Sequence, residues 1–170
     1  MRTLPSKAWT EFQKTVGSLD ENSSSRCVLE IILNWIRRNH ACFMDEPFSI
    51  YGFDRMMNVN EEVMPVEFST LKSKEVLHFR GVILKYQAKN VESIAIFLRD
   101  SIENLITIEA DRRCPLCDCW GMTPYVGKHN GFLAFQCKTC GHANYENGNK
   151  VGPGELEFAT IKNLKEFGLI

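Results

Sequence analysis

The sequence lacks long hydrophobic runs and has no excess of charge of either sign. None of its stretches approaches the roughly 18 apolar residues that cross a bilayer, and the N-terminal MRTLPSKAWTEFQK contains no apolar core for a signal peptide. The 20 Lys and Arg residues nearly balance 21 Asp and Glu residues, so the formal net charge is -1. These absences predict a cytoplasmic protein with no membrane partner, and the charge balance gives nucleic acid little to attract it.

Motifs of the common enzyme classes are also absent. The chain contains no Walker-type glycine loop, no GxGxxG, no HExxH and no GxSxG. Zinc deaminases combine H-x-E with P-C-x-x-C, but here Arg113 precedes Cys114, and none of the 4 histidines is followed by Glu two residues later. We therefore predict that the protein is not an enzyme.

Cysteine, by contrast, is plentiful, with 7 in the chain. Four of them form the pairs Cys114-Pro-Leu-Cys117 and Cys137-Lys-Thr-Cys140, in the pattern C-x2-C-x19-C-x2-C. A reducing cytoplasm disfavours disulfides, whereas this spacing is typical of a four-cysteine structural zinc site. We predict that Cys114, Cys117, Cys137 and Cys140 together bind one structural Zn²⁺ ion per chain.

A β-hairpin is predicted between the two cysteine pairs. Residues 122–127 and 132–136 have the pattern of strands, and Asn130-Gly131 between them is a favoured pair for a tight turn. A hairpin would bring the two cysteine pairs together at one end of a ribbon. Through these features, residues 111–150 resemble the zinc-ribbon fold group. The resemblance implies a structural zinc ion and a partner that is either a nucleic acid or a protein of the transcription and translation machinery.

The two cysteine pairs differ in the residue that follows them. Gly141 follows the second pair, as is usual in such turns, whereas Asp118 follows the first. Aspartate tolerates a positive φ better than most residues, so the first turn is expected to form at some cost. A shell of four sulfurs leaves no position open for water or substrate, so the metal is predicted to be structural.

Three further side chains are predicted not to bind the metal. Cys119 leaves the first turn for a strand, and we expect a small buried hydrophobic residue there rather than a swapped ligand or a redox-sensitive thiol. His142 would be a ligand only if it replaced a cysteine. His129 at the hairpin tip lies about seven strand residues from the metal, roughly 20 Å, which is too far.

The residues before the ribbon are predicted to be mainly helical. Ser24 or Ser25 can cap a buried helix whose core residues lie in Val28 to Ile36, and residues 91–106 form an amphipathic helix with Ile94 to Leu105 in the core. Trp35 and Phe97 are expected to be buried. A further helix is predicted after a cap at Ser69-Thr70, with a strand over Glu75 to Tyr86 as its rival, and residues 42–68 stay undecided.

These predictions define an α+β fold. We expect a mainly helical domain over residues 1–110, a zinc ribbon over 111–150, and a C-terminal tail over 151–170 that packs back on the body. The tail follows Gly152-Pro-Gly154 and alternates apolar and polar residues, so it can form a strand or a short helix.

The balanced charge and the missing enzyme motifs predict stoichiometric binding of another protein. Small bacterial immunity proteins and antitoxins, which bind and block a toxin, have this profile, so an inhibitor of that kind is expected by elimination. Opposite charge steers association, and a basic toxin would contact exposed acids of the chain. The candidates are Asp45, Glu46, Glu61 and Glu62.

The alternative is a nucleic-acid-binding zinc ribbon of the transcription or translation machinery. Its phosphate contacts would be Arg112, Arg113, Lys128 and Lys138. Aromatic residues of the ribbon can stack on bases or cover the hairpin's own core, and packing is the expected role. These residues are Trp120, Tyr125, Phe132 and Phe135.

Overall fold

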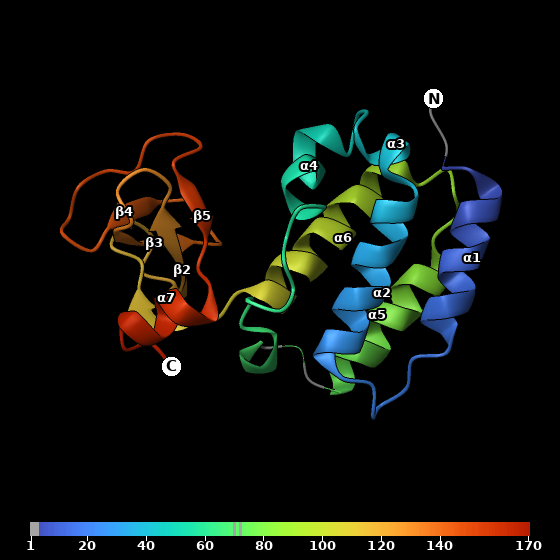
Figure 1. Cartoon of the computed structure of the whole chain (residues 1–170), viewed down its shortest axis with the longest axis horizontal. Helices are drawn as coiled ribbons and strands as arrows, with labels where there is room; N and C mark the ends of the chain where they lie inside the picture. Colours follow the sequence, from blue (N-terminus) through green and yellow to red (C-terminus); the bar gives the residue numbers. More distant parts are fainter. Residues whose placement is uncertain (1–3, 70, 72) are drawn as a thin grey trace. The chain divides into compact units, whose positions relative to one another are not determined.

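The computed structural model describes residues 4–69, 71 and 73–170, which form two compact units (Figure 1). The helical unit comprises the described residues of Met1–Glu61 and Leu71–Leu105. The sheet unit comprises those of Glu62–Thr70 and Ile106–Ile170. Helices in the first part of the chain and an antiparallel sheet in the second confirm the predicted α+β class.

The helical unit consists of four longer helices and several single turns. Its elements are α1 (Ser6–Gly17), α2 (Ser25–Arg38), α3 (His40–Phe43), η1 (Ser49–Tyr51), α4 (Phe53–Met56), α5 (Ser73–Lys85) and α6 (Val91–Ile106). No helix in the described part of the chain has the length and apolar character that a bilayer crossing requires.

Helix α2 forms where the sequence predicts it and lies at the centre of the unit's core. The Ser24 hydroxyl accepts a hydrogen bond from the Cys27 backbone N–H at 3.2 Å, which satisfies one donor of the first turn. Trp35 is buried and stacks on Phe12 of α1, with ring centroids 4.1 Å apart. The Trp35 indole N–H donates to the Ala8 carbonyl at 3.0 Å, so its one polar group is satisfied.

Helices α5 and α6 confirm the helical predictions for their segments. Residues 75–85 belong to α5, so the rival strand is wrong. The predicted cap falls partly outside the described residues, because Thr70 is not among them, and Ser69 instead ends the turn η2 (Val66–Phe68). In α6 the predicted apolar face is buried except at Phe97, which is half-buried against the Phe79 ring at a centroid distance of 5.7 Å.

One arginine of α2 holds the part of the undecided segment that follows α4. The Arg37 guanidinium donates to the carbonyl oxygens of Met57 at 3.1 Å and Val59 at 2.6 Å. It also makes two hydrogen bonds of 3.0 Å to the two carboxylate oxygens of Glu61. These contacts bind the chain after α4 to α2, and they make Glu61 an internal partner rather than a free surface acid.

The Arg37 contacts predict an acid-sensitive contribution to stability. Hydrogen bonds from Arg37 lower the pKa of Glu61 below its ordinary 4.5, although partial burial opposes the shift. A carboxyl whose pKa is lower in the folded state stabilises the fold above its unfolded pKa, and this contribution disappears as pH falls. Replacing Glu61 by Gln should therefore flatten the loss of stability below about pH 5 in urea unfolding.

The exposed Glu30 on α2 offers the control for this variant. Glu30→Gln should leave the acid dependence of stability as it is in the unchanged protein. Parallel stability curves for Glu61→Gln and the unchanged protein between about pH 5 and pH 3 would refute the role of the Arg37 contacts.

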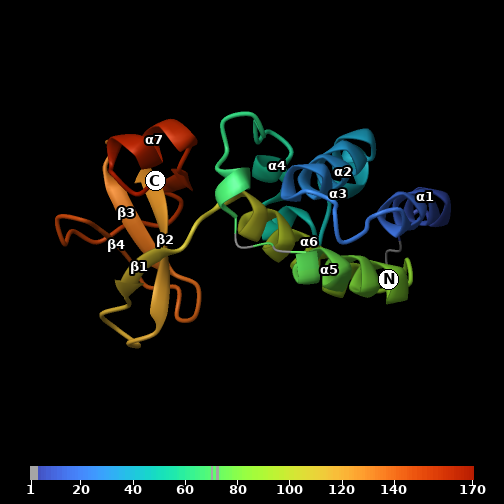
Figure 2. The ribbon, with the colours of Figure 1, turned by 90° about the horizontal axis from the view of Figure 1, so that it is seen from below.

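The sheet unit contains an antiparallel sheet of five strands. These are β1 (Ala110–Arg113), β2 (Trp120–Gly127), β3 (Leu133–Cys137), β4 (Ala143–Tyr145) and β5 (Leu156–Phe158). The strand order is β1-β2-β3-β4, and β5 also pairs with β2. Figure 2 shows β2 and β3 side by side as the two long strands of this sheet.

Residues 151–170 contribute both a strand and a helix to the sheet unit. Strand β5 pairs with β2 from Tyr125↔Phe158 to Gly127↔Leu156, and α7 (Ile161–Glu166) follows after a capping box at Thr160. Phe167 packs against the hydrophobic cluster that contains Cys114 and Cys137. The tail is thus part of the same unit as the cysteine pairs.

Candidate metal centre

The first cysteine pair lies in a tight turn closed by its own backbone. The Asp118 N–H donates to the Cys114 carbonyl, and the Cys114 N–H donates to the Cys119 carbonyl, both at 2.9 Å. Asp118 has a φ of 57°, the positive value that the sequence predicted for this residue. Aspartate therefore occupies the left-handed position that glycine takes at lower cost.

The second pair repeats this turn. The Gly141 N–H donates to the Cys137 carbonyl at 2.9 Å, and the Cys137 N–H donates to the His142 carbonyl at 2.8 Å. Gly141 has a φ of 72°. Two turns of the same geometry therefore present two cysteines each, and we call them the first and second cysteine turns.

The predicted hairpin brings the two cysteine turns together. Met122 of β2 pairs with Cys137 at the end of β3, and the pairing runs back to Val126↔Leu133. At the far end the Asn130 side chain accepts from the Phe132 N–H at 2.9 Å, and Gly131 has a φ of 68°. The hairpin and its Asn-Gly turn are confirmed.

The four paired cysteines place their sulfur atoms within metal-binding distance of one another. All four sulfurs lie within 4.8 Å of each other, with 3.5 Å between Cys114 and Cys140 and 3.6 Å between Cys117 and Cys137. All four are free cysteines rather than disulfides. Cys114 and Cys137 are buried, Cys117 is half-buried and Cys140 is exposed, so the cluster lies at the edge of the sheet unit. These four residues are positioned to bind a metal ion.

Backbone N–H groups of the two cysteine turns stabilise thiolates. Four neighbouring thiolates repel one another, however, and need a cation to balance their charge. The Cys140 backbone N–H lowers the pKa of the Cys137 thiol to about 6, against the opposing effect of burial. At Cys117 the Cys119 N–H also lowers the pKa, yet burial and hydrogen bonds with the neighbouring sulfurs outweigh it and raise this pKa well above its ordinary 9.0. A bound cation removes this competition for protons, because it stabilises all four thiolates at once.

The predicted bystanders lie outside the cluster. Among the described residues, the group of potential metal ligands at this site consists of the four paired cysteines without Cys119 or His142. Cys119 is half-buried and packs against the ribbon's hydrophobic cluster, so it is less buried than the sequence predicted. His129 is exposed in the hairpin turn, at the other end of β2 and β3.

The aromatic residues of the ribbon divide differently from the sequence prediction. The sequence predicted that these residues cover the hairpin's core. This prediction is correct for Phe135, which is buried, and wrong for Trp120 and Phe132, which are 61% and 55% exposed. Leu116 at the tip of the first cysteine turn is 69% exposed, and the sequence analysis did not single it out. Spacing in the sequence does not show which part of a strand its neighbours cover. Whether an aromatic residue near the end of a strand is buried or exposed therefore cannot be predicted from spacing alone.

The basic residues next to these aromatic side chains have acidic partners. The Arg113 guanidinium lies 2.9 Å from Asp118 and 5.2 Å from the centroid of the Trp120 ring. Arg112 lies 3.7 Å from Glu146 and 4.1 Å from the Phe135 ring centroid.

Comparisons of the chain with models of protein families, with curated proteins and with solved structures give no match.

Proposed function

We propose that Cys114, Cys117, Cys137 and Cys140 bind one structural zinc ion. Zinc–sulfur bonds of about 2.3 Å in a tetrahedron place the sulfurs about 3.8 Å apart. The distances of 3.5 Å and 3.6 Å within the cluster are close to that value. Four thiolates complete the coordination shell, so the ion has no open position for water or substrate and acts by holding the two cysteine turns together.

The zinc ion, in this proposal, supports a surface that binds another protein. Leu116 at the tip of the first cysteine turn and Trp120 just after it, which we call the knuckle surface, are 69% and 61% exposed. Tryptophan is prominent among the residues that dominate protein–protein binding, and Leu116, four positions before Trp120, adds exposed apolar surface. This exposed pair is the observation on which we base stoichiometric protein binding without turnover. Inhibition of a toxin remains a prediction from the sequence.

Local charge favours a protein over a nucleic acid at the knuckle surface. Two of the four cations that would contact phosphates already face carboxylates, since Arg113 pairs with Asp118 and Arg112 with Glu146. Exposed pairs of this kind contribute only about 0–1 kcal/mol to stability. They nevertheless cancel positive charge at the place where a phosphate backbone would need it.

Replacing the knuckle surface should strongly weaken partner binding while the fold is retained. We expect the double variant Leu116→Ser/Trp120→Ala to bind the partner at least about 30-fold more weakly, because central tryptophans at interfaces contribute 2 kcal/mol or more. The zinc-loaded protein is used to isolate the partner from its native host, and affinity is then measured with the purified partner. Zinc content shows that the variant keeps its metal centre.

A matched control comes from exposed hydrophobic residues of the helical unit. Leu84 and Ile96 are 44% and 40% exposed, so Leu84→Ser/Ile96→Ser removes exposed apolar surface elsewhere. It should leave binding unchanged. The nucleic-acid alternative predicts a different result. The chain would then recover RNA or DNA and no protein in a fixed ratio, and the nucleic acid would be released by moderate salt. Its binding would also be lost when the cations are neutralised, namely Arg112, Arg113, Lys128 and Lys138.

A further inference from the structure

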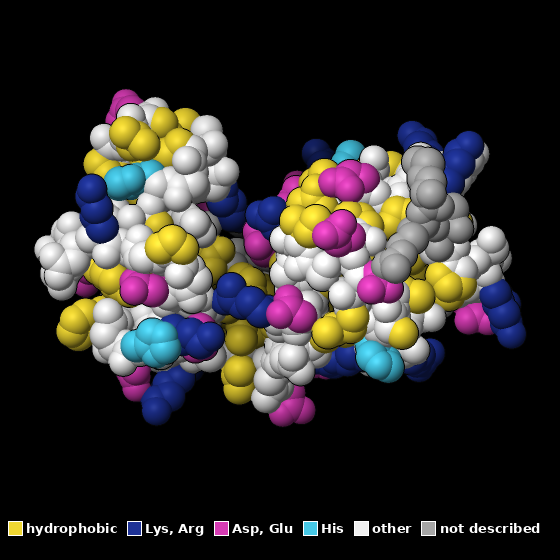
Figure 3. Space-filling model, turned by 90° about the horizontal axis from the view of Figure 1, so that it is seen from above, with side chains coloured by type: hydrophobic (Ala, Val, Ile, Leu, Met, Phe, Trp, Pro, Cys, Tyr) yellow, Lys and Arg dark blue, Asp and Glu magenta, His cyan; other side chains and the backbone are white. Residues whose placement is uncertain are grey.

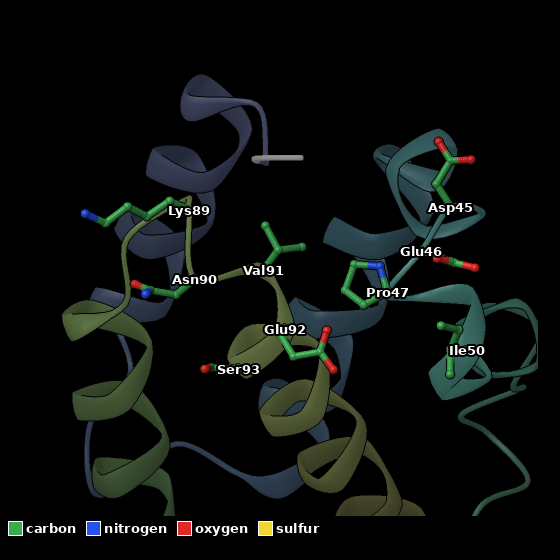
Figure 4. A pocket seen from close by; sticks show the side chains of 9 residues that line it. All are labelled: Asp45, Glu46, Pro47, Ile50, Lys89, Asn90, Val91, Glu92 and Ser93. Atoms are coloured by element: carbon green, nitrogen blue, oxygen red, sulfur yellow. The ribbon is translucent and has the colours of Figure 1, made fainter. Parts of the chain in front are cut away.

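A groove of about 800 Å³ lies in the helical unit between the segment that follows α3 and the start of α6 (Figure 4). Asp45, Glu46, Pro47 and Ile50 line one side, and Val91 and Glu92 line the other. Figure 4 shows Pro47 and Val91 facing each other across the groove, with the carboxylates of Glu46 and Glu92 at its margin. The groove thus combines an apolar centre with an acidic border.

The apolar part of the groove is open to solvent. Ile50 is 68% exposed, although isoleucine is a residue that folded proteins most often bury. Val91 is largely buried and forms the floor opposite Pro47. An aliphatic side chain of a ligand that covers Ile50 would remove apolar surface from water at about 25 cal/mol per Å².

The border of the groove carries a net negative charge. Three acidic side chains and one basic side chain line the groove, namely Asp45, Glu46 and Glu92 together with Lys89. Figure 4 shows the Lys89 side chain extending away from the carboxylates of Glu46 and Glu92. On the face of the molecule seen in Figure 3, acidic side chains of the helical unit surround exposed hydrophobic ones. A ligand that complements this border is cationic.

One of the carboxylates is held in place from within the unit. The Tyr51 hydroxyl of η1 donates a hydrogen bond to Glu92 at the start of α6. This bond raises the pKa of the Tyr51 hydroxyl, since it stabilises the protonated form. Glu92 is therefore positioned before any ligand arrives, which reduces the side-chain ordering that binding requires.

A second hollow extends the groove along the same border. It has a volume of about 240 Å³ and shares Asp45, Glu46 and Val91 with the first. Leu4 and Cys42 line its other end. The two hollows adjoin at the three residues that they share, which suits a segment of polypeptide that can contact both.

We propose that this acidic groove binds a basic, partly apolar segment of a partner protein. Arginine or lysine side chains of the segment pair with Glu46 and Glu92, and an aliphatic side chain covers Ile50. Glu61 has no part in this recognition, because its carboxylate is bound to Arg37. The inference rests on the proposed protein-binding function and adds the chemistry of the partner.

The test uses the zinc-loaded full chain and a synthetic nonapeptide of alternating arginine and leucine residues. Backbone amide shifts and calorimetry are followed at about 0.1 M salt, where charges remain visible to each other over about 10 Å. We expect saturable binding with shift changes confined to residues 42–51 and 89–93. Glu46→Gln/Glu92→Gln should weaken binding about tenfold, since charge-assisted contacts at both margins are lost. Ile50→Ser should weaken it severalfold.

Exposed acids elsewhere on the helical unit provide the control. Glu11→Gln/Glu30→Gln makes the same change in net charge on α1 and α2 and should alter affinity less than about twofold. Equal effects of the two double variants, equal binding of a peptide with glutamate in place of arginine, shifts outside the groove, or no saturable binding would each overturn the inference. If the knuckle variant loses partner binding but the peptide does not bind the groove, the proposed function is supported and only the inference about the groove is refuted.

Discussion

Removal of zinc will unfold the sheet unit and leave the helical unit folded. The buried cluster around the hairpin is small, and two of its members, Cys114 and Cys137, are proposed ligands of the zinc ion. Zinc binding to such sites supplies an apparent free energy on the order of 10–16 kcal/mol near neutral pH. We expect one zinc ion per chain by metal analysis. A strong chelator should abolish the dispersed amide signals of the sheet unit, including those of α7, and leave those of the helical unit.

Single substitutions identify the ligands in the same assay. Serine at Cys114, Cys117, Cys137 or Cys140 should remove the zinc, since each sulfur belongs to the cluster. Cys119→Ser and His142→Ala are the matched controls and should keep a full equivalent. Loss of zinc from Cys119→Ser, together with retention in Cys114→Ser, would overturn the assignment.

Truncation of Trp35 to Ala should destabilise the helical unit by about 3–5 kcal/mol, as expected for a buried tryptophan. Trp35 packs on Trp9, Phe12 and Phe43 with ring centroids 5.7, 4.1 and 5.2 Å away, so its removal leaves a cavity between three elements. Phe97→Ala should cost less, about 1–3 kcal/mol, because the Phe97 side chain is only half-buried. Urea unfolding of the zinc-loaded protein measures both.

The comparison of these two variants tests which side chains form the core. The exposed Ile96 on α6 serves as the reference substitution and should change stability by less than about 1 kcal/mol when replaced by Ala. If Trp35→Ala also changed stability by less than 1 kcal/mol, α2 would have a different face inside.

Local patterns in the sequence were sufficient to predict the cluster of four cysteines and the hairpin that joins them. The spacing of Cys114, Cys117, Cys137 and Cys140, with Asn130-Gly131 between the pairs, allows few other geometries, and the four sulfurs do lie together. Helix α2 was predictable for the same reason. The Ser24 cap involves residues within the first turn, and the apolar spacing involves residues within a few turns of each other.

Features that depend on distant contacts could not be predicted. Residues 42–68 have no regular apolar spacing, and the end of this segment is held by Arg37 of α2, which binds the carbonyl groups of Met57 and Val59, 20 and 22 positions away. The exposure of Trp120 and the half-burial of Phe97 depend on which neighbours happen to cover each ring. The acidic groove likewise joins residues 45–50 to residues 89–93, and no local pattern links these two segments.

The pairing of β2 has a consequence for how the chain emerges during synthesis. Strand β3 covers one edge of β2, and β1 and β5 share the other, β1 near Met122 and β5 along Tyr125 to Gly127. Strand β5 comes after the ribbon in the chain, so a nascent ribbon still presents free N–H and C=O groups along Tyr125 to Gly127 of this edge. Open edges of this kind recruit other strands and promote aggregation. The nascent protein is therefore most vulnerable to misassembly between synthesis of the second cysteine turn and arrival of residues 156–158.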